Sequence, residues 1–576
     1  MDKIVRVNMS DLTTSIEVVP PEWAGLGGRA LTSTIVAGEV VPTCHPLGEN
    51  NKLVFAPGLL SGTAAANTGR FSAGAKSPLT GTIKESNAGG LAAQMFARLG
   101  IKALIIEGLP KEDKWYSLHV NQDGVSIAEE TELIGKGNFA VVETLEQRLG
   151  KKVGILTIGP AGEMRMLSAN ISVKDSDSRL RSHGRGGLGA VMGSKRIKFI
   201  SIDDHDAPGV KLVDPDKFKA AARTLAKAIL DHPGTGQGLP TFGTAEMVNI
   251  INAAGSLPTR NFTYGQFEGH EDLSGETMRE IIIARGGKPK HGCQPGCIIQ
   301  CSQVYTDEDG TYVTSGFEYE TIETMGANAC VGNLDLVARA DYIMDDIGVD
   351  SIETSVTFGV AMEAGVLPFG DGREVLRILK DEIGTGTPLG RILGSGAGNV
   401  GKIYGVTRVP VVKNQAIPAY DPRAIKGIGI TYATSPMGAD HTAGYTIGHN
   451  LMGCGGRIID PLKKDEQVWL SRHLQTGQIS IDSVGLCHFV GFPMEDNPEF
   501  VPALIDLLNA RFGFDLTPAW IGDIGVAILK TERAFNIGAG FTNKHDRLPE
   551  FFREPMLPHN AVWDFTDEEI DEFWNF

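Results

Sequence analysis

The segment GCQPGCIIQCS, residues 292–302, places three cysteines within nine residues. At intervals of four, Cys293, Cys297 and Cys301 would form an apolar stripe on one buried helix. A proline and a glycine separate the first two cysteines, and a proline inside a helix removes a hydrogen bond and clashes with the preceding turn. We therefore expect an irregular loop that presents three thiols to a metal ion or an iron–sulfur cluster.

The cysteine spacing indicates which kind of site to expect. Structural zinc sites commonly use C-x2-C pairs, and this chain contains none. Three close thiolates and one distant cysteine are typical of a cubane iron–sulfur cluster. Cys487, in DSVGLC, is the best candidate for the fourth ligand, whereas Cys44, Cys330 and Cys454 are interpreted as small buried residues.

Composition narrows the class of protein. The chain of 576 residues is 42% hydrophobic and 21% charged, which is typical of a globular protein with several domains. A formal net charge of −17, without a basic stripe, excludes a nucleic-acid-binding surface. No apolar signal-peptide core or apolar run of transmembrane length occurs, and seven cysteines are too few for a disulfide framework. We expect a cytoplasmic protein with reduced thiols and no membrane insertion.

Strand and helix signals predict an α+β fold with three domains. Residues 1–207 form a β-rich N-terminal domain, because short β-branched segments recur from an opening hairpin, KIVRVN and SIEVVP, to IKFISI. Residues 208–412 are mainly helical from Asp214-Pro215 onward, which is a helix start signal. Residues 413–576 form a second mainly helical domain. Among the expected helices are 272–285, 318–329, 334–347, 352–365, 372–384, 463–474, 499–511 and 522–535. No repeat of fixed period is evident.

An Asp-x-x-Gly-(Leu/Val) element occurs twice, first from Asp345 to Val349 with Gly348 and again from Asp482 to Leu486 with Gly485. One interpretation is helix capping, since many helices end in glycine. The other is ligand binding, because a carboxylate beside a glycine turn can accept two hydrogen bonds from the amidine-like edge of a pterin ring. Two copies would suit two such rings.

Glycine-rich segments at residues 25–30, 56–90 and 179–195 are predicted to be loops that approach phosphates or polar cofactors. The sequence GAVMGSK lacks the spacing of a Walker A motif. Residues 394–401, GSGAGNVG, lack the strand–turn–helix context of a dinucleotide-binding fingerprint. Neither nucleotide site is expected.

Motifs along nearly the whole chain resemble the tungsten-containing aldehyde:ferredoxin oxidoreductase family. The matching segments, in order, are GLGGR, TGRFSAGAKSPLTG, GPAGE, GRGGLGAVMGSK, GSLPTRNF, the cysteine cluster, FEYET, AYDPR, ATSPMGADH and DSVGLC. The resemblance implies one tungsten atom held by the dithiolenes of two pterin cofactors, with a [4Fe–4S] cluster close by. It also implies oxidation of an aldehyde to its carboxylic acid, or the reverse, with electrons passing to ferredoxin or to a partner iron–sulfur or flavin subunit.

The resemblance further assigns expected roles to individual residues. Cys293, Cys297, Cys301 and Cys487 match the cluster ligands. The two pterins would be held by Asp345 and Asp482 with their glycine turns. Arg70 matches an arginine between cluster and pterin, and Asn87 matches a backbone contact to Mg²⁺ that bridges the two phosphates. Arg181 and Arg185 match positions in a phosphate-facing loop, the segment at residues 179–195.

Glu320, in FEYET, and His441, in GADH, match a glutamate and a histidine that could move protons near the metal. A high-valent metal site that oxidises an aldehyde needs a base to collect the released protons. The alternatives from the sequence alone are an ordinary carboxylate in a first helical turn, at Glu318 or Glu320, and a buried Asp440–His441 pair.

Two features depart from the family pattern. The best-known members have C-x2-C-x3-C where this chain has C-x3-C-x3-C, and no Glu-x-x-His pair is present to bridge a dimer through a metal. The oligomer could therefore be homomeric or heteromeric. Rival functions are another low-potential reaction such as reduction of an aromatic thioester, molybdenum in place of tungsten, and a non-catalytic iron–sulfur subunit that relays electrons.

Overall fold

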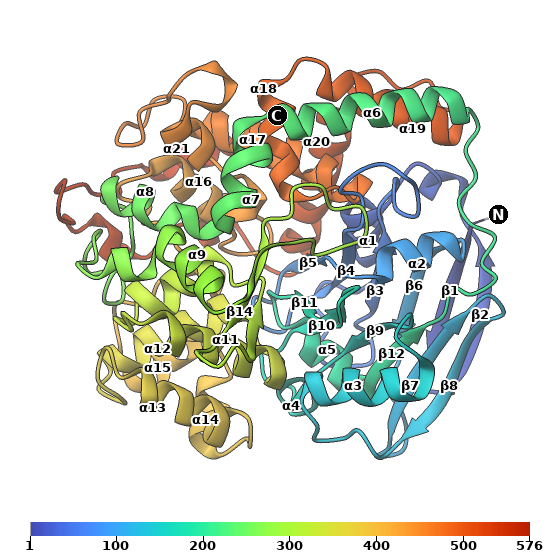
Figure 1. The fold of residues 1–576 in the computed structure, drawn as a ribbon, viewed down its shortest axis with the longest axis horizontal. Coiled ribbons are helices and arrows are strands. Elements are labelled where there is room, and N and C mark those ends of the chain that lie inside the picture. The colour runs from blue at the N-terminus through green and yellow to red at the C-terminus, as the bar shows by residue number, and fades with distance from the viewer. Residues whose placement is uncertain (1) are drawn as a thin grey trace.

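The N-terminal third of the chain folds into two six-stranded sheets, coloured blue to teal in Figure 1. The computed structural model describes residues 2–576. The first sheet has the order β2-β1-β6-β3-β4-β5, with bounds Thr13–Val18, Lys3–Asn8, Ile101–Glu107, Leu53–Pro57, Phe71–Lys76 and Ile83–Ala88. The second has the order β8-β7-β12-β9-β10-β11, with bounds Gly124–Glu130, Trp115–Asn121, Ile197–Ile202, Gly154–Thr157, Ile171–Lys174 and Leu180–His183.

The two sheets repeat one topology. In each half the first strand pairs antiparallel with the second and parallel with the sixth, and the other neighbours are antiparallel. Helices α1 (Gly28–Glu39) and α3 (Asn138–Leu149) occupy equivalent places, as do α2 (Ala92–Arg98) and α5 (Leu188–Ser194). Because no fixed-period repeat is visible in the sequence, this duplication is one of chain path and not of residue identity.

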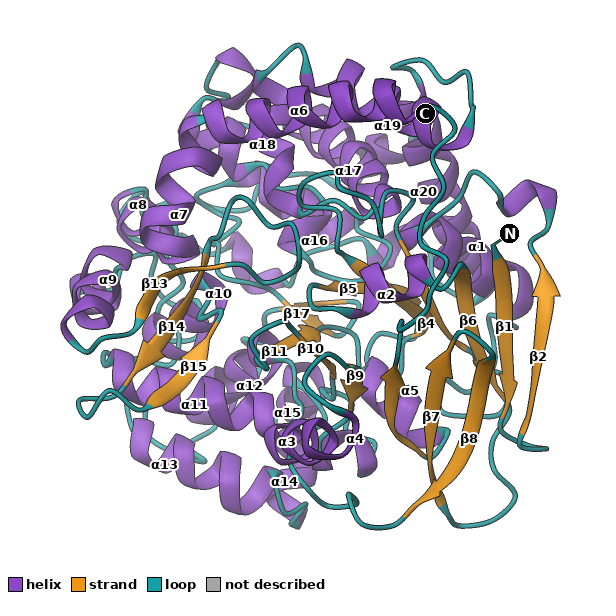
Figure 2. Ribbon diagram, turned by 45° about the vertical axis from the view of Figure 1, so that its right-hand side comes forward, coloured by secondary structure: helices purple, strands orange, loops and turns teal. Residues whose placement is uncertain are grey.

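The remainder of the chain is mainly helical, as expected (Figure 2). Helix α6 (Pro215–Asp231) begins as predicted, because the Asp214 side chain accepts a hydrogen bond from the Lys217 amide at 3.0 Å. Other long helices are α9 (Gly275–Ala284), α11 (Leu334–Ile347), α12 (Ser351–Glu363), α16 (Lys426–Thr434), α19 (Phe500–Phe512) and α20 (Trp520–Gly538). A small sheet contains β13 (Lys288–His291), β14 (Ser302–Thr306) and β15 (Tyr312–Ser315).

Three helix predictions differ from the structure in extent or in helix type. The helix expected at 372–384 is α13 (Gly372–Arg377) followed by the π-helix η6 (Ile378–Ile383). The helix expected at 463–474 is α17 (Gln467–Val484), which continues past Gly477 and places Asp482 in its last turn. Gly477 does not end the helix because the residues that follow are buried against the core. The helix expected at 318–329 is one turn, α10 (Tyr319–Thr321), followed by the π-helix η5 (Ile322–Ala327). Such π segments are frequent at functional sites.

Two of the three glycine-rich segments predicted to be loops instead enter helices. The first enters α1 and the third contains α5. Residues 394–401, for which no nucleotide site was expected, lead into α15 (Ala397–Tyr404). These glycines permit close helix packing. A Cβ atom on Gly28 would lie 2.1 Å from the Asp482 carbonyl oxygen, and one on Gly193 would lie 1.9 Å from that of Gly162. At these two glycines the backbone makes the expected close approach, but to another segment of the chain and not to a phosphate or cofactor.

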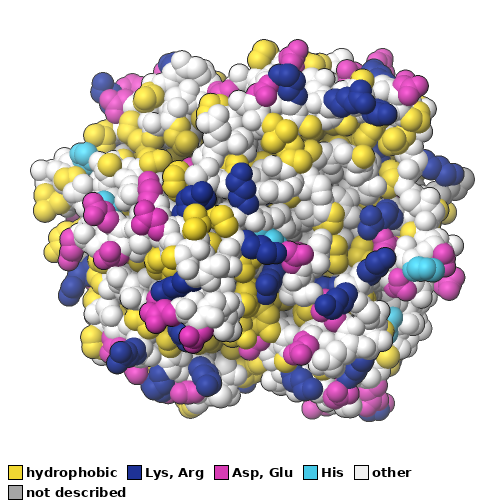
Figure 3. All heavy atoms as spheres, viewed as in Figure 1, with side chains coloured by type: hydrophobic (Ala, Val, Ile, Leu, Met, Phe, Trp, Pro, Cys, Tyr) yellow, Lys and Arg dark blue, Asp and Glu magenta, His cyan; other side chains and the backbone are white. Residues whose placement is uncertain are grey.

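Charges of both signs are mixed on the face drawn in Figure 3, where Lys and Arg side chains are interspersed with Asp and Glu. Within residues 2–576, none of the helices combines the length and the apolarity required to cross a membrane.

Candidate active site and iron–sulfur cluster site

A cavity of about 400 Å³ lies where the N-terminal sheets meet the helical part of the chain. Most of the predicted site residues line it: Arg70, Asn87, Arg181, Arg185, Cys293, Cys301, Glu320, Asp345, His441, Asp482 and Cys487. Its wall does not include Cys297, Gly348, Gly485 or Leu486. Residues that are far apart in the sequence therefore meet in one place.

The four predicted cluster cysteines come from two segments. Cys293, Cys297 and Cys301 lie on the irregular chain between β13 and β14, and Cys487 follows α17. A hydrogen bond with Cys297, together with the nearby Arg70 guanidinium, lowers the pKa of Cys293 to about 6. Burial raises the pKa of Cys487 to about 11. The expectation of a loop in place of a helix is confirmed.

Asn67 ties the two cysteine segments together, and the sequence analysis did not identify it. Its amide donates to the Gly296 carbonyl at 3.0 Å, and its own carbonyl accepts the Cys487 amide at 3.0 Å. Its side-chain oxygen also accepts the Ile298 amide at 3.1 Å. Asn67 has a left-handed φ of 60°, which asparagine adopts more readily than most residues. Nothing in the local sequence signals these contacts, because the partners are distant along the chain.

The surroundings of the thiols combine close packing with an amide donor. A Cβ atom on Gly89 would lie 2.9 Å from the Cys293 carbonyl oxygen and 3.3 Å from its Sγ, so only glycine leaves this side open. The Gln300 amide donates to Cys297 Sγ at 3.3 Å, as an amide would to a thiolate ligand. Within residues 2–576, no three His, Cys, Asp or Glu side chains converge closely enough to hold a single metal ion.

Asp482 lines the cavity within a network of buried polar groups. Its carboxylate accepts hydrogen bonds from Gln478 Nε2 at 2.7 Å and from Asn87 Nδ2 at 3.3 Å, and it lies 3.4 Å from Arg29 Nη1. Burial raises the pKa of Asp482, although the positive charge of Arg29 acts to lower it. Burial and the Asp482 carboxylate also raise the pKa of Glu85 to about 8, and Glu85 Oε1 has no hydrogen-bond partner.

Asp345, in the last turn of α11, also lines the cavity. Burial and the neighbouring carboxyl of Asp341 raise its pKa well above the ordinary value, and burial raises the pKa of Asp341 to about 7. The Asp345 carbonyl accepts a hydrogen bond from Asn138 Nδ2 at 2.8 Å, which fixes the helix end against α3. These buried carboxyl groups can bind a ligand that brings N–H donors.

Of the two predicted site arginines of the third glycine-rich segment, Arg185 lies in a loop as expected, between β11 and α5, and Arg181 does not. Arg181 lies on strand β11 and not in a loop, where Asp175 Oδ2 accepts from its Nε at 3.1 Å and its Nη2 at 3.0 Å. Arg185 donates to the carbonyls of Ala439 at 2.7 Å and Ala416 at 2.6 Å. Both guanidinium groups line the cavity while being held by the protein, so they provide fixed positive charge.

The duplicated sheets explain why the Asp-x-x-Gly element occurs twice. Gly348 and Gly485 end α11 and α17 with left-handed φ values of 79° and 83°, so the capping interpretation holds for both glycines. Gly485 packs on Gly58, which follows β3, and Gly348 packs on Gly159, which follows the equivalent strand β9. Each half of the repeat therefore receives one helix end, and each helix end brings one aspartate to the cavity.

The Gly485→Ala variant is expected to be less stable by roughly 2–4 kcal/mol, because a left-handed φ and a backbone contact would both be strained. A Cβ atom there would lie 2.9 Å from Gly58 Cα. Thermal unfolding followed by circular dichroism measures the effect. Gly25→Ala is the control, since nothing lies within 4 Å of its Cβ position and its φ is not left-handed. Equal midpoints for the two variants would contradict this account.

Glu320 and His441 form a largely buried pair on the cavity wall, with side chains 13% and 12% exposed. His441 Nε2 lies 2.9 Å from Glu320 Oε1, and the Tyr420 hydroxyl donates to the same oxygen at 3.3 Å. Burial opposes ionisation of both groups, but their mutual attraction prevails, so the pKa of Glu320 is lowered and that of His441 is raised. His441 Nδ1 has no hydrogen-bond partner. The pair therefore shares a proton between a carboxylate and an imidazole.

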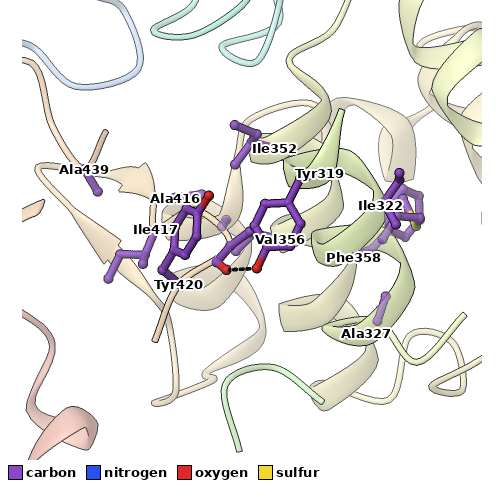
Figure 4. Packing of buried hydrophobic residues seen from close by; sticks show 14 of the residues in the cluster. Tyr319, Ile322, Ala327, Ile352, Val356, Phe358, Ala416, Ile417, Tyr420 and Ala439 are labelled. Atoms are coloured by element: carbon purple, nitrogen blue, oxygen red, sulfur yellow. Dashed lines mark hydrogen bonds between the residues drawn. The ribbon is translucent and has the colours of Figure 1, made fainter. Parts of the chain in front are cut away.

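Aromatic packing fixes this pair in position. The rings of Tyr319 and Tyr420 lie side by side with centroids 5.2 Å apart, and the Tyr319 hydroxyl donates to the Ala419 carbonyl at 2.7 Å (Figure 4). Tyr420 in turn contacts the hydroxyl of Tyr445 at 2.9 Å. The two neighbouring carboxylates have different partners: Glu318 accepts a hydrogen bond from Thr244, whereas Glu320 pairs with His441.

Comparison with known proteins covers almost the whole chain. Residues 4–204 match the N-terminal domain of aldehyde ferredoxin oxidoreductase, and residues 220–576 match its domains 2 and 3. The chain belongs to the aldehyde ferredoxin oxidoreductase family. It is thus an enzyme of an oxidoreductase family, and the resemblance drawn from its motifs is confirmed.

Three relatives from Pyrococcus species illustrate the similarity. The tungsten-containing aldehyde ferredoxin oxidoreductase of Pyrococcus furiosus is 33% identical over 574 residues, covering 96% of this chain and 92% of the relative. The protein of the same name from Pyrococcus horikoshii is 35% identical over 577 residues, with the same coverage. The WOR-like subunit of an aliphatic sulfonate oxidoreductase from Pyrococcus furiosus is 26% identical over 593 residues, covering 93% and 86%.

The fold has a solved counterpart. The active-site complex of benzoyl coenzyme A reductase with 1,5-dienoyl-CoA superimposes with a TM-score of 0.79 over 99% of this chain and 92% of that chain, at 18% identity. This likeness concerns the fold, and it agrees with a β-rich N-terminal part followed by helical parts.

Proposed function

We propose that the protein oxidises aldehydes to carboxylic acids, or catalyses the reverse reaction, at a tungsten–bis(pterin) centre. The observation that carries this proposal is the Glu320–His441 pair, buried 2.9 Å apart in a cavity that also contains the two aspartates and the cysteine thiols. Aldehyde oxidation with water releases two electrons and two protons, so it needs a proton acceptor beside an electron acceptor. The relatives named as tungsten-containing support this choice of metal.

The residues present fit such cofactors. Asp345 and Asp482, one from each half of the repeat, would each accept hydrogen bonds from one pterin, because their buried carboxyl groups need N–H donors. Arg70 would lie between cluster and pterin, and the Asn87 region would contact Mg²⁺ between the phosphates. The fixed charges of Arg181 and Arg185 would face the phosphates.

Cys293, Cys297, Cys301 and Cys487 would hold a [4Fe–4S] cluster, with the first three on one loop and the fourth after α17. Three domains would share these roles. Residues 1–207 would bind the bis-pterin cofactor, and residues 208–412 and 413–576 would supply the cluster ligands, the two aspartates and the catalytic pair. When bound, the tungsten centre takes up two electrons from the substrate, and the cluster provides their route to ferredoxin or to a partner iron–sulfur or flavin subunit.

The chain's own residues orient the substrate and handle its protons. His441, with its raised pKa, would donate a hydrogen bond to the aldehyde oxygen. Glu320, with its lowered pKa, is a carboxylate at neutral pH. It would accept a proton from the water that attacks the aldehyde or from the aldehyde hydrate. Phe489 and Phe492 line the same cavity and would exclude bulk water.

Elemental analysis of anaerobically purified protein, combined with a panel of aldehydes and a viologen dye, tests the proposal. We expect about one tungsten and four iron atoms per chain, as one mononuclear site and one [4Fe–4S] cluster require, and dye reduction that depends on aldehyde. Tungsten-loaded protein that is inert to every aldehyde but reduces an aromatic thioester would overturn the aldehyde assignment. Molybdenum in place of tungsten would overturn the metal assignment alone.

A further inference from the structure

A second, smaller cavity of about 40 Å³ adjoins the active-site cavity. Tyr445, Gln478, His488 and Phe492 line both cavities, so they form the partition between them. The volume is sufficient for at least one water molecule, and the lining offers several polar atoms to bind it. The far wall of the small cavity carries His449, Cys454 and Glu495.

These far-wall groups belong to a cluster that reaches the surface. Glu495 Oε2 lies 3.5 Å from His449 Nε2 and 3.2 Å from His473 Nε2, and the His473 side chain is 45% exposed. Burial opposes ionisation of Glu495, but hydrogen bonds to the two histidines lower its pKa to about 2, and the hydrogen bond to Glu495 raises the pKa of His473. Cys454 also faces Glu495, and Asp496 is held by the Gly455 amide at 2.7 Å.

Hydroxyl groups connect the catalytic pair to the partition. The Tyr420 hydroxyl contacts Glu320 Oε1 at 3.3 Å and the Tyr445 hydroxyl at 2.9 Å. Burial raises the pKa of both tyrosines, so each keeps its proton at neutral pH and can only pass protons on. Tyr445 is the last of these groups, and it borders the small cavity.

We propose that protons collected by Glu320 leave through Tyr420, Tyr445 and water in the small cavity to the His449–Glu495–His473 cluster, which releases them to solvent. Glu320 gives its proton to the Tyr420 oxygen as Tyr420 gives its own to Tyr445, and Tyr445 passes one to the water. Each hydroxyl ends with one proton, so one proton moves outward and no other bond changes. This inference rests on the proposed function, because aldehyde oxidation is what supplies the protons.

Single-turnover kinetics on tungsten-loaded enzyme separate proton exit from chemistry. Cluster reduction is followed by its visible absorbance, and proton release by a pH-indicator dye in weak buffer. In the Tyr445→Phe and Glu495→Gln variants, we expect proton release to lag behind cluster reduction by roughly 10- to 100-fold, with recovery when imidazole buffer is added. His232→Asn is the matched control, because His232 pairs with Asp496 at 2.9 Å on the same side but lies off the route.

The outcomes are distinct. Proton release that keeps pace with cluster reduction in either variant overturns the route, whereas wild-type enzyme without aldehyde-dependent cluster reduction overturns the proposed function.

A second measurement needs no cofactor. The pH dependence of His473 modification by diethyl pyrocarbonate, read by mass spectrometry, reports the pKa of His473. Glu495→Gln should move that pKa down toward the ordinary histidine value of about 6.5. An unchanged profile contradicts the coupling of Glu495 to His473.

Discussion

Replacing Cys487 with alanine is expected to remove the iron of the cluster site while most of the fold remains. Cys487 is the one proposed ligand outside the cysteine loop, and a [4Fe–4S] cluster that loses a thiolate ligand is usually lost or degraded. The side chain is small, and its backbone amide bond to Asn67 does not depend on the thiol. Iron and tungsten per chain, measured by mass spectrometry of the digested protein, should show loss of iron.

Cys330→Ala is the control for this experiment, because Cys330 lies at a helix-to-loop position away from the cavity and is not expected to bind metal. Circular dichroism would establish that both variants are folded. Iron in Cys487→Ala equal to that of wild type would remove Cys487 from the ligand set. Because electrons leave through this cluster in the proposed function, dye reduction should fall together with the iron.

An iron–sulfur site could be proposed from the sequence because its chemistry is concentrated in a few residue types. Three cysteines in one loop leave few alternatives, and the loop predicted from Pro295 is present. The sequence could not indicate Asn67, because an asparagine that joins Gly296 to Cys487 looks like any other loop asparagine. Its role arises from tertiary proximity and from a backbone conformation that no short motif encodes.

The local elements of the fold could be predicted from the sequence, but their tertiary arrangement could not. Strand-forming segments and the capped start of α6 follow from local side-chain chemistry, and they are confirmed. The helices that begin in glycine-rich segments were missed because glycine is intrinsically a poor helix former. At Gly28 the close contact with the Asp482 backbone outweighs that preference. The duplicated sheets were also missed, since strand pairing is a property of the whole chain and not of a local pattern.

The residues of the proposed proton route could not be predicted from the sequence, in contrast to the proposed catalytic pair. Glu320 and His441 could be singled out through the family resemblance, and the structure brings them to 2.9 Å. Tyr445 and Glu495 had no such signal. Their importance is inferred from a shared cavity wall and from contacts between segments that are separate in the sequence.

His441→Gln and Glu320→Gln are expected to lower kcat by roughly 100- to 10,000-fold, the range typical of general acid–base groups. The two side chains depend on each other, since each holds the other in its ionised form within a buried site. Tungsten content should stay near that of wild type, because neither residue is a proposed cofactor ligand. Glu318→Gln, which removes a carboxyl group bonded to Thr244 and not to His441, should cause a much smaller loss.

The pH dependence of kcat/KM provides the sharper test of this pair. In wild type the acidic limb follows protonation of Glu320, whose pKa is lowered, and the alkaline limb follows deprotonation of His441, whose pKa is raised, so the active range is broad. In His441→Gln the partner charge is lost and burial of Glu320 is no longer opposed by it. The acidic limb should therefore move to higher pH. A limb that stays in place would show that Glu320 titrates independently of His441 and is not the proton acceptor of a coupled pair.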